Sequence, residues 1–183
     1  MPCFEVHLTF DVQPHQYVLF LNLCDVLGAK PLEIVLATGH YPKHVMISKT
    51  LQANHIDDVL STSQCWANYF TKNNMALLRT KVETPVNELY TALYYEWHGR
   101  VLYEDVPKLI DLCEQYDVHL SKNALKQHAQ TRFLTLRDTN ITQFEMRLKK
   151  FKDALVQQKR DLEKQQHECC IYDDGIRLDQ GWA

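Results

Sequence analysis

The architecture of this chain follows from a short alternating stretch near its start, Phe4-Glu5-Val6-His7-Leu8-Thr9-Phe10. Apolar and polar side chains alternate there with a period of two, which is typical of a β-strand with one apolar face. Apolar residues at helical spacing follow over residues 14–27 and end at Gly28, a common helix stop. Beyond them the pattern predicts strands over 32–36 and 45–47, a helix over 56–73 and a strand over 75–82.

The second half of the chain repeats this order at a spacing of about 90 residues. The stretch Tyr95-Glu96-Trp97-His98 matches Phe4-Glu5-Val6-His7, and Arg137 matches Lys49. The pattern predicts a helix over 106–116, a strand over 132–137, a long helix over 141–167 and a closing strand over 169–178. Self-similarity of this kind indicates an internal duplication.

The predicted fold class is therefore α+β, with two tandem ferredoxin-like repeats of the order βαββαβ. The first repeat spans residues 1–86, and the second spans residues 87–183 with the long helix. In such a unit the helices cover one face of the sheet and leave the other face open. Two open faces packed against each other would form a barrel or a cleft.

The open face carries the candidate site. Residues two apart on a strand point the same way, so each Glu-x-His stretch places a carboxylate beside an imidazole. We expect six residues to bind a small anionic ligand in the groove between the repeats: Glu5, His7, Lys49, Glu96, His98 and Arg137. Four of them are also candidate ligands for a divalent metal, the one cofactor that the pattern suggests: Glu5, His7, Glu96 and His98. The alternative is a solvated sheet face with cross-strand Glu–His and Glu–Arg pairs.

Composition narrows the choice of partner. The formal net charge is −3, so no basic excess points to nucleic acid. The chain shows no apolar run long enough to span a bilayer and no secretion signal before the first strand. Six cysteines without a Cys-x-x-Cys pattern are typical of reduced thiols. We therefore expect a cytoplasmic protein that binds a small molecule rather than nucleic acid or a membrane, with a homodimer left open.

Three short resemblances bear on function. His7-Leu8-Thr9 and His119-Leu120-Ser121 are similar to the His-x-Ser/Thr motif of two-histidine phosphoesterases, in which paired histidines act as general acid and base. Phe4-Glu5-Val6-His7 and the strand over 132–137 resemble CYTH-type triphosphate tunnel enzymes, although His7 and Thr9 stand where those enzymes have Glu and Lys. Two stretches are similar to signatures of an uncharacterised family with this two-unit layout: His119-Leu120-Ser121-Lys122-Asn123-Ala124, and Tyr172-Asp173-Asp174 followed by Leu178-Asp179-Gln180-Gly181-Trp182.

Two classes of function follow from these patterns. The first is a ligand-binding or regulatory protein that uses the groove between the repeats. The second is a small metal-dependent or acid–base-dependent enzyme acting on a phosphorylated substrate, as a phosphoesterase or triphosphatase does. Both require the two Glu-x-His strands to face one shared space.

Overall fold

The computed structural model describes residues 1–183 except 38, 87–88, 126–129 and 181–183. The first half contains β1 (Cys3–Asp11), the 3₁₀ turn η1 (Pro14–Gln16), α1 (Tyr17–Leu27), β2 (Lys30–Leu36), β3 (Lys43–Gln52), α2 (Ile56–Thr71) and β4 (Ala76–Pro85). The second half contains β5 (Tyr94–Leu102), α3 (Val106–Tyr116), β6 (His119–Asn123), β7 (Thr131–Asp138), α4 (Ile141–Gln157), β8 (Leu162–Asp173) and the 3₁₀ turn η2 (Ile176–Asp179). Gly181 and Trp182 of the C-terminal signature lie outside the described residues.

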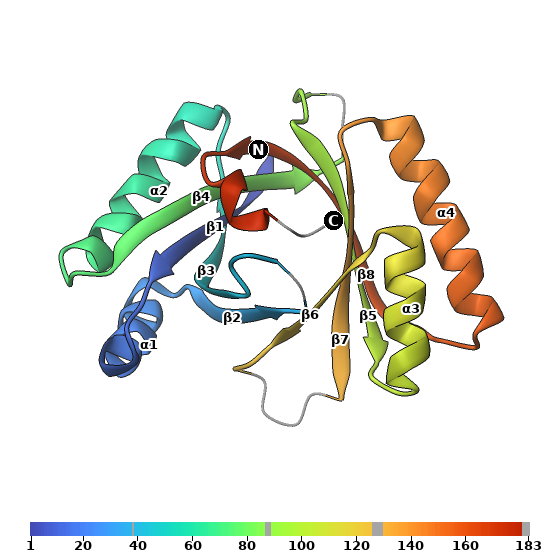
Figure 1. The fold of residues 1–183 in the computed structure, drawn as a ribbon. Coiled ribbons are helices and arrows are strands. Elements are labelled where there is room, and N and C mark those ends of the chain that lie inside the picture. The colour runs from blue at the N-terminus through green and yellow to red at the C-terminus, as the bar shows by residue number, and fades with distance from the viewer. Residues whose placement is uncertain (38, 87–88, 126–129, 181–183) are drawn as a thin grey trace.

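Eight strands form one closed barrel in the order β1-β3-β2-β6-β7-β5-β8-β4, and neighbouring strands are antiparallel. The two halves of the chain meet at the β2–β6 and β4–β8 seams. Figure 1 shows α1 and α2 on the outside of one half of the barrel and α3 and α4 on the outside of the other. The predicted α+β class is therefore confirmed, and of the two predicted alternatives, a barrel or a cleft, the structure has the barrel.

The strand order is the same in each half. It is β2-β3-β1-β4 in the first half and β6-β7-β5-β8 in the second. Glu5 lies opposite Glu83 on β4, and Glu96 lies opposite Glu168 on β8. Side chains at corresponding places in the two halves can therefore be compared one by one.

The helices bury the apolar faces of the strands in two separate cores. Phe4, Val6 and Leu8 pack under α1 and α2, and Trp97 and Val101 pack under α3 and α4. All five side chains are inaccessible to solvent, and each such burial contributes about 1.5–3 kcal/mol. The apolar side of each strand faces the helices, as the alternation predicts, so the polar side faces the barrel interior. In the described part of the chain, no helix combines the length and the apolar character needed to cross a membrane.

The prediction of a long helix over 141–167 is wrong for its last ten residues. Helix α4 ends at Gln157, and Lys159 adopts a φ of 55°, which turns the backbone out of the helix. Arg160 then donates hydrogen bonds to the backbone carbonyls of Glu104 and Asp105, which fixes this turn beside the start of α3. Leu162 continues the helical spacing in the sequence, but it packs on the same core from strand β8.

The bounds of the closing strand also need correction, and one strand was not predicted. The closing strand predicted over 169–178 runs instead over Leu162–Asp173, and the chain then forms η2. The sequence pattern also missed β6, a five-residue strand whose composition is mostly polar. This strand is needed because it pairs with both β2 and β7 and so closes the barrel between the two halves.

Candidate functional site

The barrel encloses a cavity of about 240 Å³, lined by inward-facing side chains from all eight strands and from η2. One wall is apolar and consists of Leu32, Ile34, Leu36, Met46 and Phe133. Most of the other lining residues are charged or polar, and the charged ones lie mainly on β1, β4, β5, β7 and β8. The cavity can therefore contact both an apolar body and a polar group of one small ligand.

Glu96 is the centre of the ionic wall. Its side chain is 0% exposed, and its carboxylate accepts hydrogen bonds from Lys81 Nζ at 2.5 Å and from Arg137 Nε at 2.7 Å. His98 Nε2 lies 3.3 Å from the same carboxylate. Burial alone would raise the pKa of Glu96, but the charges of Arg137 and Lys81 outweigh it and hold the pKa well below its usual range. Glu96 is therefore a buried, fixed negative charge.

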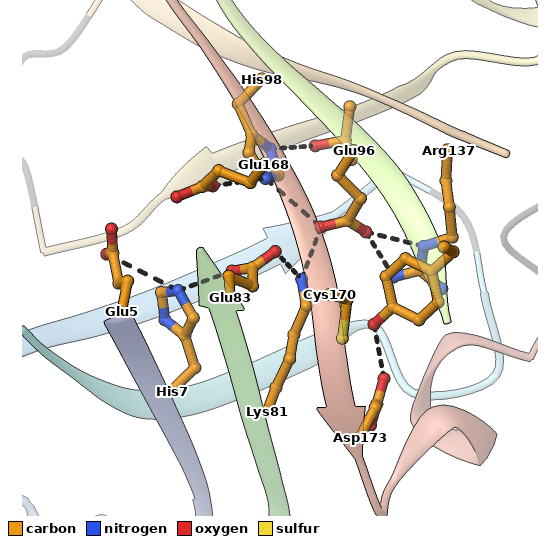
Figure 2. A network of polar contacts seen from close by, with 12 residues as sticks. Glu5, His7, Lys81, Glu83, Glu96, His98, Arg137, Glu168, Cys170 and Asp173 are labelled. Atoms are coloured by element: carbon orange, nitrogen blue, oxygen red, sulfur yellow. Dashed lines mark hydrogen bonds and ion pairs between the residues drawn. The ribbon is translucent and has the colours of Figure 1, made fainter. Parts of the chain in front are cut away.

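Glu83 is a second buried carboxylate, on the neighbouring strand β4. It accepts hydrogen bonds from His7 Nε2 at 3.0 Å and pairs with Lys81 Nζ at 2.7 Å. Glu5 lies 3.6 Å from the same imidazole nitrogen and accepts a hydrogen bond from Ser48 Oγ at 2.6 Å. Burial raises the pKa of Glu83, and the ammonium of Lys81 and the hydrogen bond from His7 reverse that shift. Figure 2 shows Lys81 reaching between Glu83 and Glu96.

Glu168 on β8 behaves differently. Its carboxylate accepts a hydrogen bond from the neutral amide of Gln166 at 2.6 Å, and His98 Nε2 lies 3.6 Å away. Burial, together with the charge of Glu83, raises the pKa of Glu168 to about 7. Burial lowers the pKa of His98, but its hydrogen bond to Glu96 and the charges of Glu96 and Glu83 together outweigh burial and raise the pKa above its usual value. Glu168 can therefore take up or release a proton near neutral pH beside the imidazole of His98.

The end of the chain closes one end of the cavity. Asp179 of η2 accepts hydrogen bonds from Arg79 at 2.9 Å and from Arg137 at 2.8 Å. Arg79 also pairs with Asp173 at the end of β8, and Tyr94 donates a hydrogen bond to that carboxylate at 2.6 Å. These side chains are all buried or nearly so. They form a dense ionic layer next to η2.

The opposite end of the cavity is open to solvent. Along β8 the lining residues pass from exposed Lys164 through half-buried Gln166 to buried Glu168. Along β1 they pass from half-buried Glu5 to buried Thr9, which lies opposite Arg79. Exposure therefore falls steadily towards η2, and a ligand would approach from the Lys164 end.

The described residues contain one group that could hold a metal ion, namely Glu83, Glu96 and His98, whose ligand atoms lie within 4.8 Å of one another. Glu96 and His98 belong to the predicted metal set. The other two predicted ligands, Glu5 and His7, are not in this group. Lys81 Nζ already lies between the two carboxylates and neutralises them. A divalent cation would have to displace this ammonium, so the donor set fits a lysine better than a metal.

Five of the six predicted ligand-binding residues line the one cavity: Glu5, His7, Glu96, His98 and Arg137. Lys49 does not. It donates hydrogen bonds to the backbone carbonyls of Leu27 and Gly28 and lies over the ring of Trp66, on the outer face of β3. The predicted match between Lys49 and Arg137 is wrong by one residue. Thr50 lies opposite Glu5, just as Arg137 lies opposite Glu96, and a slip of one residue moves a side chain to the other face of a sheet.

The sequence analysis missed the ionic residues of β4 and β8. Arg79, Lys81 and Glu83 alternate on β4 in the same way as Glu5 and His7 alternate on β1, so the signal was present. Glu168 was missed because it lay between the predicted helix, which ended at residue 167, and the predicted strand, which began at residue 169. The two His-x-Ser/Thr stretches do reach the same cavity, which His7, Thr9, His119 and Ser121 all line.

Comparisons with known proteins do not identify a family for this chain. No protein-family model matches the chain, and no curated protein matches it. The small subunit of acetolactate synthase from Thermotoga maritima is similar at 13% identity over 94% of this chain and 96% of that one, with a TM-score of 0.34. A protein provisionally described as a monooxygenase from Fusobacterium nucleatum is similar at 12% identity over 94% of both chains, with a TM-score of 0.38. These scores are too low to support an inference about function.

Proposed function

We propose that the barrel interior binds a small organic anion and that the protein is a ligand-binding or regulatory protein. The observation that carries this proposal is the charge of the cavity. Six described lining residues are Lys or Arg and five are Asp or Glu: Lys30, Arg79, Lys81, Arg100, Arg137 and Lys164, against Glu5, Glu83, Glu96, Glu168 and Asp179. The whole chain has 20 Lys and Arg against 23 Asp and Glu. The raised pKa of His98 favours the charged form of its imidazole inside the barrel.

The size of the cavity limits the ligand. A volume of about 240 Å³ lies below the usual range of pockets for drug-sized molecules, which starts at about 300 Å³. We therefore propose a ligand of metabolite size rather than a nucleotide or a peptide.

We also propose that the two halves are copies of one ferredoxin-like unit, divided near residues 86 and 87. Their identical strand orders support this view, as do the equivalent pairs Glu5–Glu83 and Glu96–Glu168. A duplicated unit brings the same polar face into the barrel twice. The site would then be a two-fold arrangement of carboxylates and imidazoles that later sequence changes have made unequal.

The binding proposal can be tested by thermal unfolding in the presence of small probes. Butyl phosphate and hexanoate should raise the melting temperature, whereas butanol and butylamine should not. A probe at a hundred times its Kd adds about 2.7 kcal/mol of stability, which corresponds to a shift of roughly 5–10 °C for a chain of this size. No shift with any anion would contradict the proposal.

A double variant locates the binding within the barrel. His7→Gln with His98→Gln replaces two side chains that line the cavity and should reduce the shifts caused by the anions. The matched control is His15→Gln with His55→Gln, because both of those histidines are exposed and lie outside the cavity lining. Equal shifts in the two double variants would place the anion elsewhere on the protein.

A second candidate function is acid–base catalysis on a phosphorylated substrate. The observation that favours it is the pairing of Glu168, with a pKa of about 7, and His98 in one cavity, because general acid–base catalysis works best with groups that titrate near the working pH. Hydrolysis of p-nitrophenyl phosphate and bis(p-nitrophenyl) phosphate between pH 5 and 9 tests this function. A rate that depends on pH around 7 and is lost in Glu168→Gln would support it, and the absence of turnover would leave binding as the function.

A further inference from the structure

The central cations of the cavity are already occupied by the protein's own carboxylates. Lys81 pairs with Glu83 and Glu96, and Arg137 pairs with Glu96 and Asp179. A ligand anion in this region would have to compete with buried, fixed carboxylates for each cation. It would also meet their negative charge, because Glu83 and Glu96 both have lowered pKa values. The centre of the barrel is therefore a poor place for an anionic group.

The cations at the open end have more capacity to bind an anion. Lys164 and Lys30 are exposed, and the described residues offer no carboxylate partner to either of them. Arg100 lies directly opposite Lys164 on the neighbouring strand. Arg100 Nε pairs with Glu163 at 2.8 Å, and the two side chains are 31% and 34% exposed. This pair is less buried than the pairs of Glu96, whose side chain is 0% exposed. Since β2 lies four strands from β8 around the barrel, Lys30, which is exposed at the start of β2, and Lys164 line opposite walls of the cavity.

The apolar wall begins beside these cations and continues inwards. Phe133 lies opposite Arg100 on β7. On β2, Leu32 and Ile34 follow Lys30 on the same inward face, and Met46 lies opposite Leu32 on β3. An apolar group that entered past the cations would therefore leave water along this wall, and such burial is favourable in proportion to the area removed from water.

We infer that the ligand is an anionic amphiphile, whose phosphate or carboxylate lies at the open end between Arg100, Lys164 and Lys30 and whose apolar body lies along Leu32, Met46 and Phe133. This inference rests on the proposed binding function and assigns the orientation and chemical class of the ligand. The reverse orientation brings the anionic group to Glu83, Glu96 and Asp179 and the apolar body to the charged opening. Both contacts are unfavourable, so the charges fix the direction of binding.

Titration calorimetry with a series of probes tests the inference. Inorganic phosphate, methyl phosphate, butyl phosphate and hexyl phosphate share one anionic group and differ in the length of the apolar chain. We expect inorganic phosphate to bind most weakly and each buried methylene to tighten binding about fourfold, until the cavity is filled. Hexanoate tests whether a carboxylate can replace the phosphate, and binding of either anion supports the inference.

Variants separate the two parts of the ligand. Arg100→Gln with Lys164→Gln should weaken every alkyl phosphate by a similar factor, about tenfold or more, because two charges are lost from the opening. Met46→Gln, which is nearly equal in volume, should weaken hexyl phosphate and leave methyl phosphate unchanged. Lys122→Gln is the matched control, since Lys122 is an exposed lysine on β6 outside the cavity lining.

The possible failures can be told apart. Affinity that does not depend on chain length would overturn the amphiphile and leave the binding of an anion intact. Full affinity in the Arg100 and Lys164 double variant would overturn the position of the anionic group. Binding of hexylamine in preference to hexyl phosphate, or binding of no probe at all, would overturn the proposed function together with this inference.

Discussion

Glu83 and Glu168 occupy equivalent places in the two halves of the barrel, yet their environments differ in one decisive residue. Glu83 lies opposite Glu5 and Glu168 lies opposite Glu96. One position further along the inward face, β4 has Lys81 and β8 has Gln166. The ammonium of Lys81 keeps the pKa of Glu83 below its usual value, whereas Gln166 offers only a neutral amide and Glu168 has a pKa of about 7.

The difference shows how one residue can separate the pKa values of two carboxyl groups in equivalent positions. A pair of buried carboxylates cannot both stay charged without a cation nearby, and the single ammonium of Lys81 serves Glu83 and Glu96 rather than Glu168. The first half of the barrel therefore supplies a fixed ion pair, and the second half supplies a group that titrates. Replacing Lys81 or Gln166 makes the halves more alike and tests this account.

The largest effect is expected from Lys81→Met, which removes the ammonium and nearly preserves the length of the side chain. Glu83 and Glu96 would be left buried without their shared cation, and breaking a buried ion pair in this way costs about 3–5 kcal/mol. Urea unfolding at pH 7 measures the change. The loss should be smaller at pH 5, where Glu83 can be protonated instead, and a loss below about 1 kcal/mol at pH 7 would refute the role given to Lys81.

Glu168→Gln isolates the titrating carboxyl. In the folded chain its pKa is about 7, above the ordinary value of 4.5 that applies to the unfolded chain. The folded state thus holds a proton that the unfolded state releases, and this contribution to stability is complete below pH 4.5 and is lost as the pH rises to about 7. The loss is on the order of 3 kcal/mol.

The neutral glutamine has no proton to lose, so the variant should match the wild type in stability near pH 4.5 and exceed it at pH 8. Urea titrations at half-unit steps of pH measure the difference between the two proteins, which removes the contributions of the other titrating groups. A constant difference across the range would show that Glu168 titrates normally.

Gln166→Lys should make the second half resemble the first. An ammonium at this position would lie near Glu168 and Glu5, both of which accept from the Gln166 amide in the wild type. We expect the pKa of Glu168 to fall by at least about one unit, a change worth about 1.4 kcal/mol. Carbon-13 NMR of the labelled carboxyl measures this pKa directly, and an unchanged value would mean that the absence of a cation is not what raises it.

The sequence predicts the fold well where the apolar face of an element repeats. The alternation of Phe4, Val6 and Leu8 identifies β1 and its helix-facing side, because a strand with one buried face must alternate. The same reasoning fails at β6, whose five mostly polar residues carry little apolar pattern. It also fails at the end of α4, where Leu162 fits the spacing of a helix but packs from a strand.

The sequence of a single strand predicts which of its side chains share a face, but not which side chains of other strands they meet. The two Glu-x-His stretches have an unambiguous face, so their meeting in one cavity follows from the closure of the barrel. The cations that pair with them lie on β4 and β7. Arg137 was predicted, whereas Lys81 was missed although it alternates with Glu83 on β4, and only the register between strands shows which carboxylate each cation meets. Sequence matching paired Lys49 with Arg137, but the register puts Thr50 opposite Glu5 and Arg137 opposite Glu96.

Lys49→Gln tests that correction, and its effect should be the smallest. Lys49 lies outside the cavity and donates to the last carbonyls of α1, where a positive charge is favourable. We expect a loss of about 0.5–1 kcal/mol in urea unfolding and no change in the calorimetric affinity for hexyl phosphate. Arg100→Gln should behave in the opposite way, with weaker binding and little loss of stability. If Lys49→Gln instead weakened binding tenfold, the outward face of β3 would have to take part in the site. That result would contradict the conclusion that Thr50, rather than Lys49, is equivalent to Arg137.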